Sequence, residues 1–454
     1  MYATQTTAQK VKVLLSLLLP ILVTQIGMSA MNFFDTLMSG HAGTHDLAGV
    51  AIGSSLWVPV FTGLSGILIS LTTLISHHIG NKRQKAVPFT LIQALYLSII
   101  IALLVMIIGS FVLQPILNLM DLTSDVQRIA AGYLRALAVG MIPLFIYGVL
   151  RNFIDAHGKT NLSMLITLSS LPINILFNYL FIFGKLGFPR LGGIGAGYAT
   201  AMTYWIITAI AVLVIWRGSI FSQYKGDYKV YPLSLKEWKV LLKIGVPIGL
   251  SIFFETSIFS AVTLFMSQYN TVTIAAHQAA INFESLLFMV PLSISMALTI
   301  AVAFENGASR HQDAKTYSQL GIGMALGIAL ILSVFLFLFR ESFAHLYSED
   351  TEVIAMTSHF LIYAVFFQIS DALQAPIQGA LRGYRDVNTA LIMTLIAYWI
   401  IGLPAGYVLA NFTHFGPFGY WIGLIIGLAI GAIGLAIRLN QIQNHNQKKD
   451  QTSS

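Results

Sequence analysis

The chain has 454 residues, of which 56% are hydrophobic and only 9% are charged. Because an average soluble domain contains about 25% charged residues, this chain has too few charges to cover a soluble globule. It contains no cysteine, which excludes disulfides, thiol catalysis and cysteine-bound metals. The composition predicts a polytopic membrane protein.

Twelve apolar stretches follow one another along the chain, and each is long enough for the roughly 20-residue helix that crosses a hydrocarbon core. None shows the alternating pattern of a barrel strand. The sequence therefore predicts an all-α membrane protein with twelve transmembrane helices, near residues 13–38, 47–76, 86–113, 127–154, 160–183, 194–217, 240–266, 275–303, 314–339, 353–380, 387–411 and 417–438.

Basic residues are concentrated on one side of this predicted bundle. Most of the 25 Lys and Arg residues fall in the two termini and in alternate loops, whereas the remaining loops are acidic. By the positive-inside rule both termini are cytoplasmic, and we expect a monomer in a bacterial cytoplasmic membrane. The net charge of +7 comes mostly from these basic residues on the cytoplasmic side, so no nucleic-acid partner is expected.

The second half of the chain resembles the first at an offset of about 227 residues. Pro20-Ile21 falls on Pro247-Ile248, and the segment 151–161 falls on 378–388. With six spans in each half the repeat is parallel, which is typical of transporters and places the substrate path between the halves. We expect two pseudo-symmetric six-helix lobes (1–217 and 240–438), a cytoplasmic linker between the lobes (218–239) and a disordered cytoplasmic tail (439–454).

Four acids lie well inside predicted spans: Asp35, Glu255, Glu284 and Asp371. An ionisable group in a span is costly and is functional by default. No Lys or Arg is expected at the same depth, except for Arg135 near the outer end of its span. The interior is therefore expected to be acidic and to suit cations.

Asp35 has potential partners in the first half. Asn174 and Asn178 share one face of a helix, and the next span offers Thr200. These hard oxygen atoms could enclose Na⁺ or relay a proton. Two simpler interpretations stay open: Asp35 could reach water at the interface, and the asparagines could only link helices.

The second half offers Glu255 and Asp371, with Glu284 as a possible additional acid. Like charges in one half-bundle repel, so we expect a bound cation, such as Na⁺, or a proton among them. Each acid could instead form a hydrogen bond to a backbone carbonyl as a neutral group.

Other motifs have structural interpretations. Gly423, Gly427 and Gly431 have the spacing of close helix packing, and His277 is expected to be a hydrogen-bonded residue rather than a ligand. No GxxxxGK[ST], HExxH or GxSxG motif occurs. We therefore expect no enzyme and no cofactor, and transport driven by an ion gradient.

Four segments together resemble the multidrug and toxic compound extrusion (MATE) family and its NorM branch: Phe34–Gly40, Ala275–Phe283, Gln378–Gly383 and Pro172–Gly195. The resemblance covers about residues 10–438. It implies a V-shaped pair of lobes that exports cationic and aromatic drugs in exchange for Na⁺ or H⁺. By this resemblance, the functional residues of the family correspond to Asp35, with Asn174, Asn178 and Thr200 as its partners, and to Glu255 and Asp371. The chain departs from the pattern at Glu284 and at Phe367, where some members have tyrosine.

Three other functions are alternatives to drug export. A lipid-linked oligosaccharide flippase of the same superfamily would need cationic residues for its pyrophosphate cargo, whereas the predicted deep charges are acidic. A membrane hydrolase would need a nucleophile–base pair that the sequence lacks, and a channel would not need deep acids in both halves. For the coupling ion we favour Na⁺ over H⁺, because amide and hydroxyl oxygens accompany Asp35.

Overall fold

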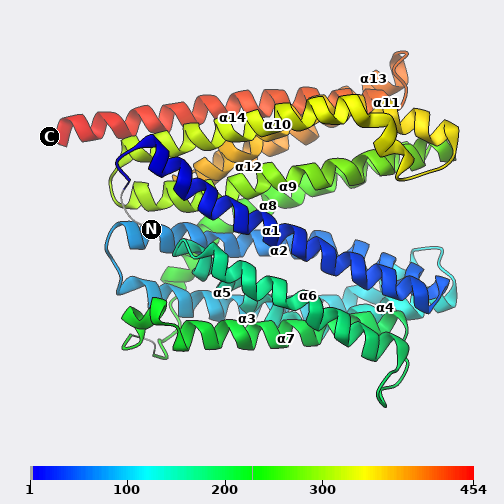
Figure 1. Cartoon of the computed structure of the whole chain (residues 1–454), viewed down its shortest axis with the longest axis horizontal. Helices are drawn as coiled ribbons and strands as arrows, with labels where there is room; N and C mark the ends of the chain where they lie inside the picture. Colours follow the sequence, from blue (N-terminus) through cyan, green and yellow to red (C-terminus); the bar gives the residue numbers. More distant parts are fainter. Residues whose placement is uncertain (1–3, 228, 454) are drawn as a thin grey trace. The chain divides into compact units, whose positions relative to one another are not determined.

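A computed structural model describes residues 4–227 and 229–453, and most of them are helical (Figure 1). This confirms the all-α class. The helices are α1 Thr7–Ala42, α2 Thr44–Gly80, α3 Ala86–Asn118, α4 Ser124–Ala138, α5 Met141–Ala156, α6 Thr160–Phe183, α7 Gly193–Arg217, η1 Ser219–Tyr224, α8 Leu235–Met266, α9 Thr271–Gly307, α10 His311–His345, α11 Thr351–Gly383, α12 Val387–Thr394, η2 Leu395–Gly402, α13 Leu403–Phe412 and α14 Phe418–Ser453.

Within the described residues, eleven helices are long and apolar enough to cross a membrane, and a bent pair makes up to twelve. The pair is α4 and α5, which meet at 53° where the sequence predicts one span over 127–154. Gly140 lies at the bend, and a Cβ there would be 2.4 Å from Cα of Ala201. Only glycine allows α7 to approach the chain so closely at this point.

The chain forms two compact units, and both breaks fall at a proline. One unit is Pro20–Val246, and the other joins Met1–Leu19 to Pro247–Ser454. Pro20 and Pro247 are equivalent in the repeat and lie inside α1 and α8. Each of these two helices is therefore divided between the units, whereas the lobes expected from the sequence contain whole helices.

Contacts inside each unit hold the divided helices. Lys10 of α1 forms an ion pair with Asp313 of α10, with 2.9 Å between Nζ and Oδ1. A Cβ on Gly245 of α8 would lie 2.3 Å from the carbonyl oxygen of Ile67 in α2. The first part of α1 thus packs with the second half of the chain, and the first part of α8 packs with the first half.

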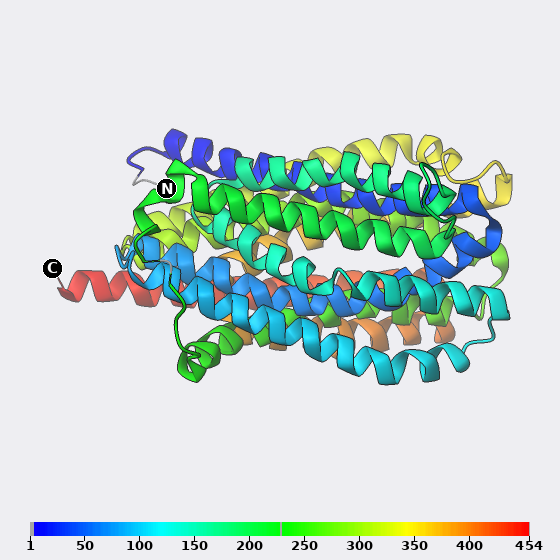
Figure 2. The same cartoon turned by 90° about the horizontal axis from the view of Figure 1, so that it is seen from below.

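The segment between α7 and α8 belongs to the unit Pro20–Val246 and lies at the end of the helices where α7 ends and α8 begins (Figure 2). Phe221 and Tyr224 of η1 are buried, and the hydroxyl of Tyr224 lies 3.0 Å from Nε2 of His157. Further along, Gln93 of α3 donates a 2.8 Å hydrogen bond to the carbonyl of Pro232. The expected linker 218–239 is thus an ordered connection, although its Tyr228 lies outside the described residues.

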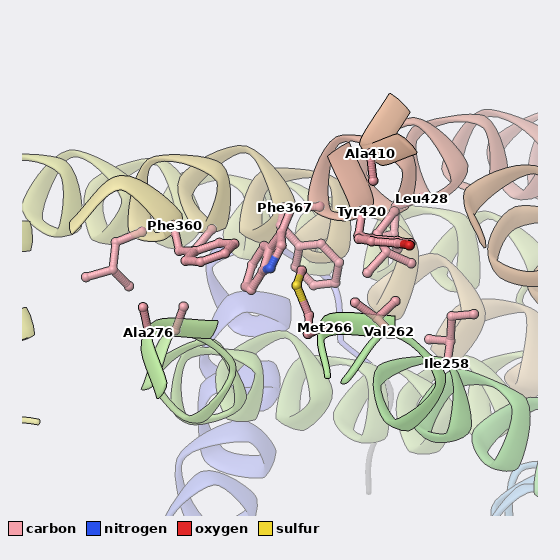
Figure 3. Packing of buried hydrophobic residues seen from close by; sticks show 14 of the residues in the cluster. Ile258, Val262, Met266, Ala276, Phe360, Phe367, Ala410, Tyr420 and Leu428 are labelled. Carbon is pink, nitrogen blue, oxygen red and sulfur yellow. The ribbon is translucent and has the colours of Figure 1, made fainter. Parts of the chain in front are cut away.

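Aromatic residues form the core of the second unit. Figure 3 shows Phe360 and Phe367 of α11 among apolar side chains of α8, α9 and α14. Between α13 and α14 the backbones approach closely, since a Cβ on Gly423 would lie 2.3 Å from the amide nitrogen of Gly406. The structural interpretation of the Gly423 to Gly431 spacing is confirmed.

The tail expected to be disordered is helical in the structure. Helix α14 continues to Ser453, and Lys315 of α10 donates a hydrogen bond to Gln447 (3.3 Å). No Gly or Pro follows Gly434, so nothing in the sequence ends the helix. The prediction from polarity overlooked this helix propensity. Ser454 lies outside the described residues.

Candidate functional site: buried carboxylates in each unit

Asp35 of α1 lies inside its unit, with only 4% of its surface exposed. Its two carboxylate oxygens accept hydrogen bonds from different helices. Nδ2 of Asn178 in α6 lies 2.6 Å from Oδ1, and Oγ1 of Thr200 in α7 lies 2.8 Å from Oδ2. The structure therefore does not place Asp35 in water at an interface.

Asn174 completes the group by linking the two donors of Asp35 to each other. Its Oδ1 accepts a 3.0 Å hydrogen bond from Asn178, one turn later in α6, and its Nδ2 donates a 3.4 Å hydrogen bond to Thr200. Gly195 allows α7 to pack closely on α6, because a Cβ there would lie 2.6 Å from the carbonyl of Phe181. All four residues expected from the sequence come together.

The donor set of this site fits a small cation. Oδ1 of Asn178 is buried and has no hydrogen-bond partner, and neither has Oγ of Ser39, one turn after Asp35. Buried polar atoms are normally paired, so two such oxygens beside a carboxylate are potential ligands. Carboxylate, amide and hydroxyl oxygens are the ligands that hard cations take.

The second unit buries three further acids. Asp371 of α11 and Glu284 of α9 are 3% and 4% exposed, and Glu255 of α8 is half-buried. Electrostatic repulsion acts among all three, and Oε1 of Glu284 has no hydrogen-bond partner. Among the described residues, no hydrogen bond joins the acids, and no group of three or more His, Asp or Glu has metal-binding geometry.

Tyr398 is a site residue that the sequence analysis missed. It lies in η2, a π-helix within the eleventh predicted span, and its hydroxyl lies 3.5 Å from Oε1 of Glu255. The next residue, Trp399, donates a 3.1 Å hydrogen bond to the carbonyl of Phe254. π-Helical turns are frequent at functional sites, and this one directs two consecutive side chains toward α8.

Two arginines that the sequence places toward the ends of spans are covered by other helices. Arg382 of α11 is 5% exposed, interacts electrostatically with Glu255 and donates a hydrogen bond to Gln378 (3.4 Å). In the other unit Arg151 of α5 lies 3.7 Å from Oδ2 of Asp155. Hydropathy places both arginines near predicted loops, but their helices extend beyond the predicted spans and other helices cover them.

The buried acids differ in whether an arginine forms an ion pair with them. Asp155 and Glu305 are buried, and each has an arginine within 4.0 Å, Arg151 and Arg310 respectively. In the described part of the chain no Lys, Arg or His lies within that distance of the four acids expected at the site, which are Asp35, Glu255, Glu284 and Asp371. Asp35, Glu284 and Asp371 therefore lack the local charge balance of Asp155 and Glu305, whereas Glu255 interacts electrostatically with the more distant Arg382.

His277 of α9 is hydrogen-bonded on both sides of its ring. Because Trp421 Nε1 can only donate, Nδ1 of His277 accepts this 3.1 Å hydrogen bond and Nε2 donates to Thr263 (3.1 Å). The hydroxyl of Thr263 in turn donates to the carbonyl of Phe259 (2.9 Å). The structural interpretation of His277 is confirmed.

A bundle of apolar helices built from two repeated halves, with acids buried in each half, is typical of membrane transporters. The family model named MatE matches the chain twice, over residues 20–180 and 247–408. The chain belongs to the MatE family of multi-pass membrane transporters. Both matches begin at the prolines that divide the units, and membership of a transporter family confirms that the chain is not an enzyme.

Full-length relatives agree. The "Probable multidrug resistance protein NorM" of Halalkalibacterium halodurans is 57% identical over 443 residues, which cover 98% of this chain and 97% of that protein. The protein of the same name from Bacillus subtilis is 53% identical over 449 residues and 99% of each chain. The resemblance found in the sequence motifs is confirmed.

Solved structures show the same fold. A structure described as "MATE in the bent conformation" has a TM-score of 0.88 at 20% identity and covers 98% of this chain and 99% of that one. The eukaryotic MATE transporter AtDTX14 has a TM-score of 0.83 at 21% identity over 97% and 99%. A superfamily transporter from Pyrococcus furiosus, described as having a binding pocket of reverse polarity, has a TM-score of 0.85 at 19% identity over 98% and 100%.

Proposed function

We propose that this protein is a multidrug efflux transporter that exports lipophilic and aromatic cations in exchange for Na⁺ or H⁺. The observation that carries the proposal is the lack of an ion-pair partner at Asp35, Glu284 and Asp371 among the described residues, in contrast to Asp155 and Glu305. A buried carboxylate without a fixed counter-charge is stabilised by a mobile cation. The names of the relatives support drugs as cargo.

Na⁺ is the proposed coupling ion. At Asp35 the carboxylate would hold the ion together with the oxygens of Asn174, Asn178 and Thr200. Asn178 now directs its amide nitrogen at Asp35, so a rotation of that amide would bring its unpartnered oxygen to the ion. A proton would need one carboxylate only and would leave the surrounding oxygens without a role. Glu255 and Asp371 form the proposed second Na⁺ site, with Glu284 as an additional acid.

Exchange follows from competition for negative charge. A cationic drug and Na⁺ both stabilise the buried carboxylates, so that binding of one lowers the affinity for the other. The protein needs no further cofactor for this cycle. We further propose that it acts as a monomer in the bacterial cytoplasmic membrane. In this proposal both termini lie in the cytoplasm, because most Lys and Arg residues lie on the same side of the predicted bundle as the termini.

The alternative function is flipping of a lipid-linked oligosaccharide. Pocket polarity separates the two functions, since a pyrophosphate cargo requires several cationic groups. The basic groups in the helices near the buried acids are the partly buried Arg151, which is paired with Asp155, and the buried Arg382. The buried acids outnumber these arginines, which favours a cationic cargo.

Ethidium efflux from proteoliposomes tests the proposal when Na⁺ and pH gradients are imposed separately. We expect efflux that depends on the Na⁺ gradient at fixed pH. Efflux that continues after both gradients are collapsed, or that requires ATP, would exclude ion exchange. Full activity on a pH gradient in Na⁺-free buffer would assign the coupling to H⁺ instead.

A further inference from the structure

The connection between α7 and α8 carries a surface that is both basic and apolar. Five lysines are exposed here, and three of them, at positions 236, 239 and 243, share one side of α8. Large apolar side chains are exposed among them: Val230 is 91% exposed, Leu233 63% and Leu235 76%. We call this set the linker surface, consisting of Lys225, Lys229, Val230, Leu233, Leu235, Lys236, Lys239 and Lys243.

The opposite side of this segment is held by specific contacts, so the exposure of the linker surface is fixed by the fold. Oε1 of Gln93 accepts a 3.0 Å hydrogen bond from the amide of Ser234, and Tyr96 donates a 3.1 Å hydrogen bond to the carbonyl of Tyr231. Glu237 accepts a 2.8 Å hydrogen bond from Thr90 of α3. The one acid of this part of α8 therefore points toward α3, and the lysines dominate the outer side.

The position of the segment identifies its partner. It connects α7 and α8, which are both long and apolar enough to cross the membrane, so it lies where the bilayer meets water. Apolar side chains next to lysines are typical of segments that lie in the headgroup region, where the ammonium groups contact lipid phosphates and the apolar groups enter the acyl boundary.

We propose that the linker surface binds anionic phospholipids of the adjoining leaflet. The ammonium groups of Lys236 and Lys239 contact the phosphates, and Val230 and Leu233 contact the acyl chains. Because the segment joins the two halves of the chain, bound lipid would stabilise this connection. The site lies outside the carboxylate sites and is independent of the transported ion and cargo.

Titration with short-chain phosphatidylglycerol, followed by native mass spectrometry of the purified protein in neutral detergent, tests the proposal. Each lysine near an anionic membrane surface strengthens binding about fivefold, so Lys236→Gln with Lys239→Gln should weaken it about 30-fold. The matched control is Lys12→Gln with Lys185→Gln, two exposed lysines outside this surface, and it should change binding less than twofold. Equal weakening in both double variants, or none in the first, would overturn the proposal.

The apolar part is tested separately. Val230→Ser with Leu233→Ser should weaken phosphatidylglycerol binding several-fold, and glycerophosphate, which has no acyl chains, should not compete with the lipid. Competition by glycerophosphate or by polyglutamate at the same concentration as the lipid would show a general anion or acidic-protein surface and would contradict the proposal. Thermal unfolding of each variant checks that the fold is retained.

Discussion

Asn178 donates a 2.6 Å hydrogen bond to Oδ1 of Asp35, while its own amide oxygen is buried without a partner. The carboxylate is thus held by neutral donors alone, and the group that would compensate its charge is absent from the fixed structure. Asp155 in the same unit shows the alternative, because Arg151 pairs with it at 3.7 Å. This contrast is the basis of the proposed exchange of cations at Asp35.

Asn178→Ala should raise the Na⁺ concentration for half-maximal efflux about tenfold or more, because it removes the amide oxygen proposed as a Na⁺ ligand, and a polar contact to a charged group contributes about 1.5–3 kcal/mol. Asn174→Ala is the comparison, since the amide oxygen of Asn174 already accepts a hydrogen bond from Asn178, whereas that of Asn178 has no partner, and its effect should be smaller. The measurement is Na⁺-dependent ethidium efflux at fixed pH. Equal effects of the two substitutions would argue against a direct role of Asn178.

Glu284→Gln should leave Na⁺-stimulated efflux within about twofold of the wild type. The substitution removes the repulsion on Asp371 and Glu255, and Oε1 of Glu284 has no hydrogen bond to lose. Thermal stability should therefore be equal or higher, because relief of like-charge repulsion is favourable. Loss of Na⁺ stimulation would place Glu284 in the coupling site itself.

Tyr398→Phe should reduce Na⁺-driven efflux about three- to tenfold, since it removes the hydroxyl that contacts Glu255. Trp399→Phe removes a hydrogen bond to a backbone carbonyl of α8 from the same π-helix. It should lower thermal stability with little change in the Na⁺ dependence. If both variants change only stability, Tyr398 has a structural role alone.

We expect His157 to make the folded state less stable at acidic pH, because it contacts the connection between the two halves of the chain. Burial, with a smaller contribution from nearby Lys159, lowers the pKa of His157 to about 4. Its Nδ1 lies 2.7 Å from the carbonyl of Phe153, and Nε2 accepts from Tyr224. The folded state binds fewer protons than the unfolded state between the ordinary pKa of about 6.5 and 4, so stability should fall as the pH drops through this window.

Thermal unfolding in detergent at pH 7.5, 6.5 and 5.5 measures this effect. His157→Asn keeps a donor for the Phe153 carbonyl and does not titrate, so its melting temperature should depend less on pH. An equal decline in both proteins would show that other groups cause the acid sensitivity.

The residues around Asp35 could be predicted from the sequence because local periodicity defines them. Asn174 and Asn178 are one turn apart, and small residues before Thr200 signal close packing. Similarly, hydropathy alone locates most spans. The bend between α4 and α5 was not predicted, because it depends on the approach of Ala201 to Gly140, a contact between distant residues.

The second site was predicted less well. No sequence pattern distinguishes a π-helix from an α-helix, so the orientation of Tyr398 toward Glu255 could not be foreseen. Arg382 follows a predicted span and resembles a loop residue, whereas α11 continues through it and buries it. The division of α1 and α8 between the units also depends on tertiary contacts, such as that of Lys10 with Asp313.

The most direct test of Na⁺ exchange at Asp35 compares the wild type with Asp35→Asn in proteoliposomes. The imposed Na⁺ gradient runs opposite to the direction of drug transport. The substitution removes the negative charge and little volume, so the melting temperature should remain close to that of the wild type. If Asp35 is the coupling carboxylate, gradient-driven ethidium efflux falls to the passive leak. Efflux at the wild-type rate from a folded Asp35→Asn protein would contradict this role.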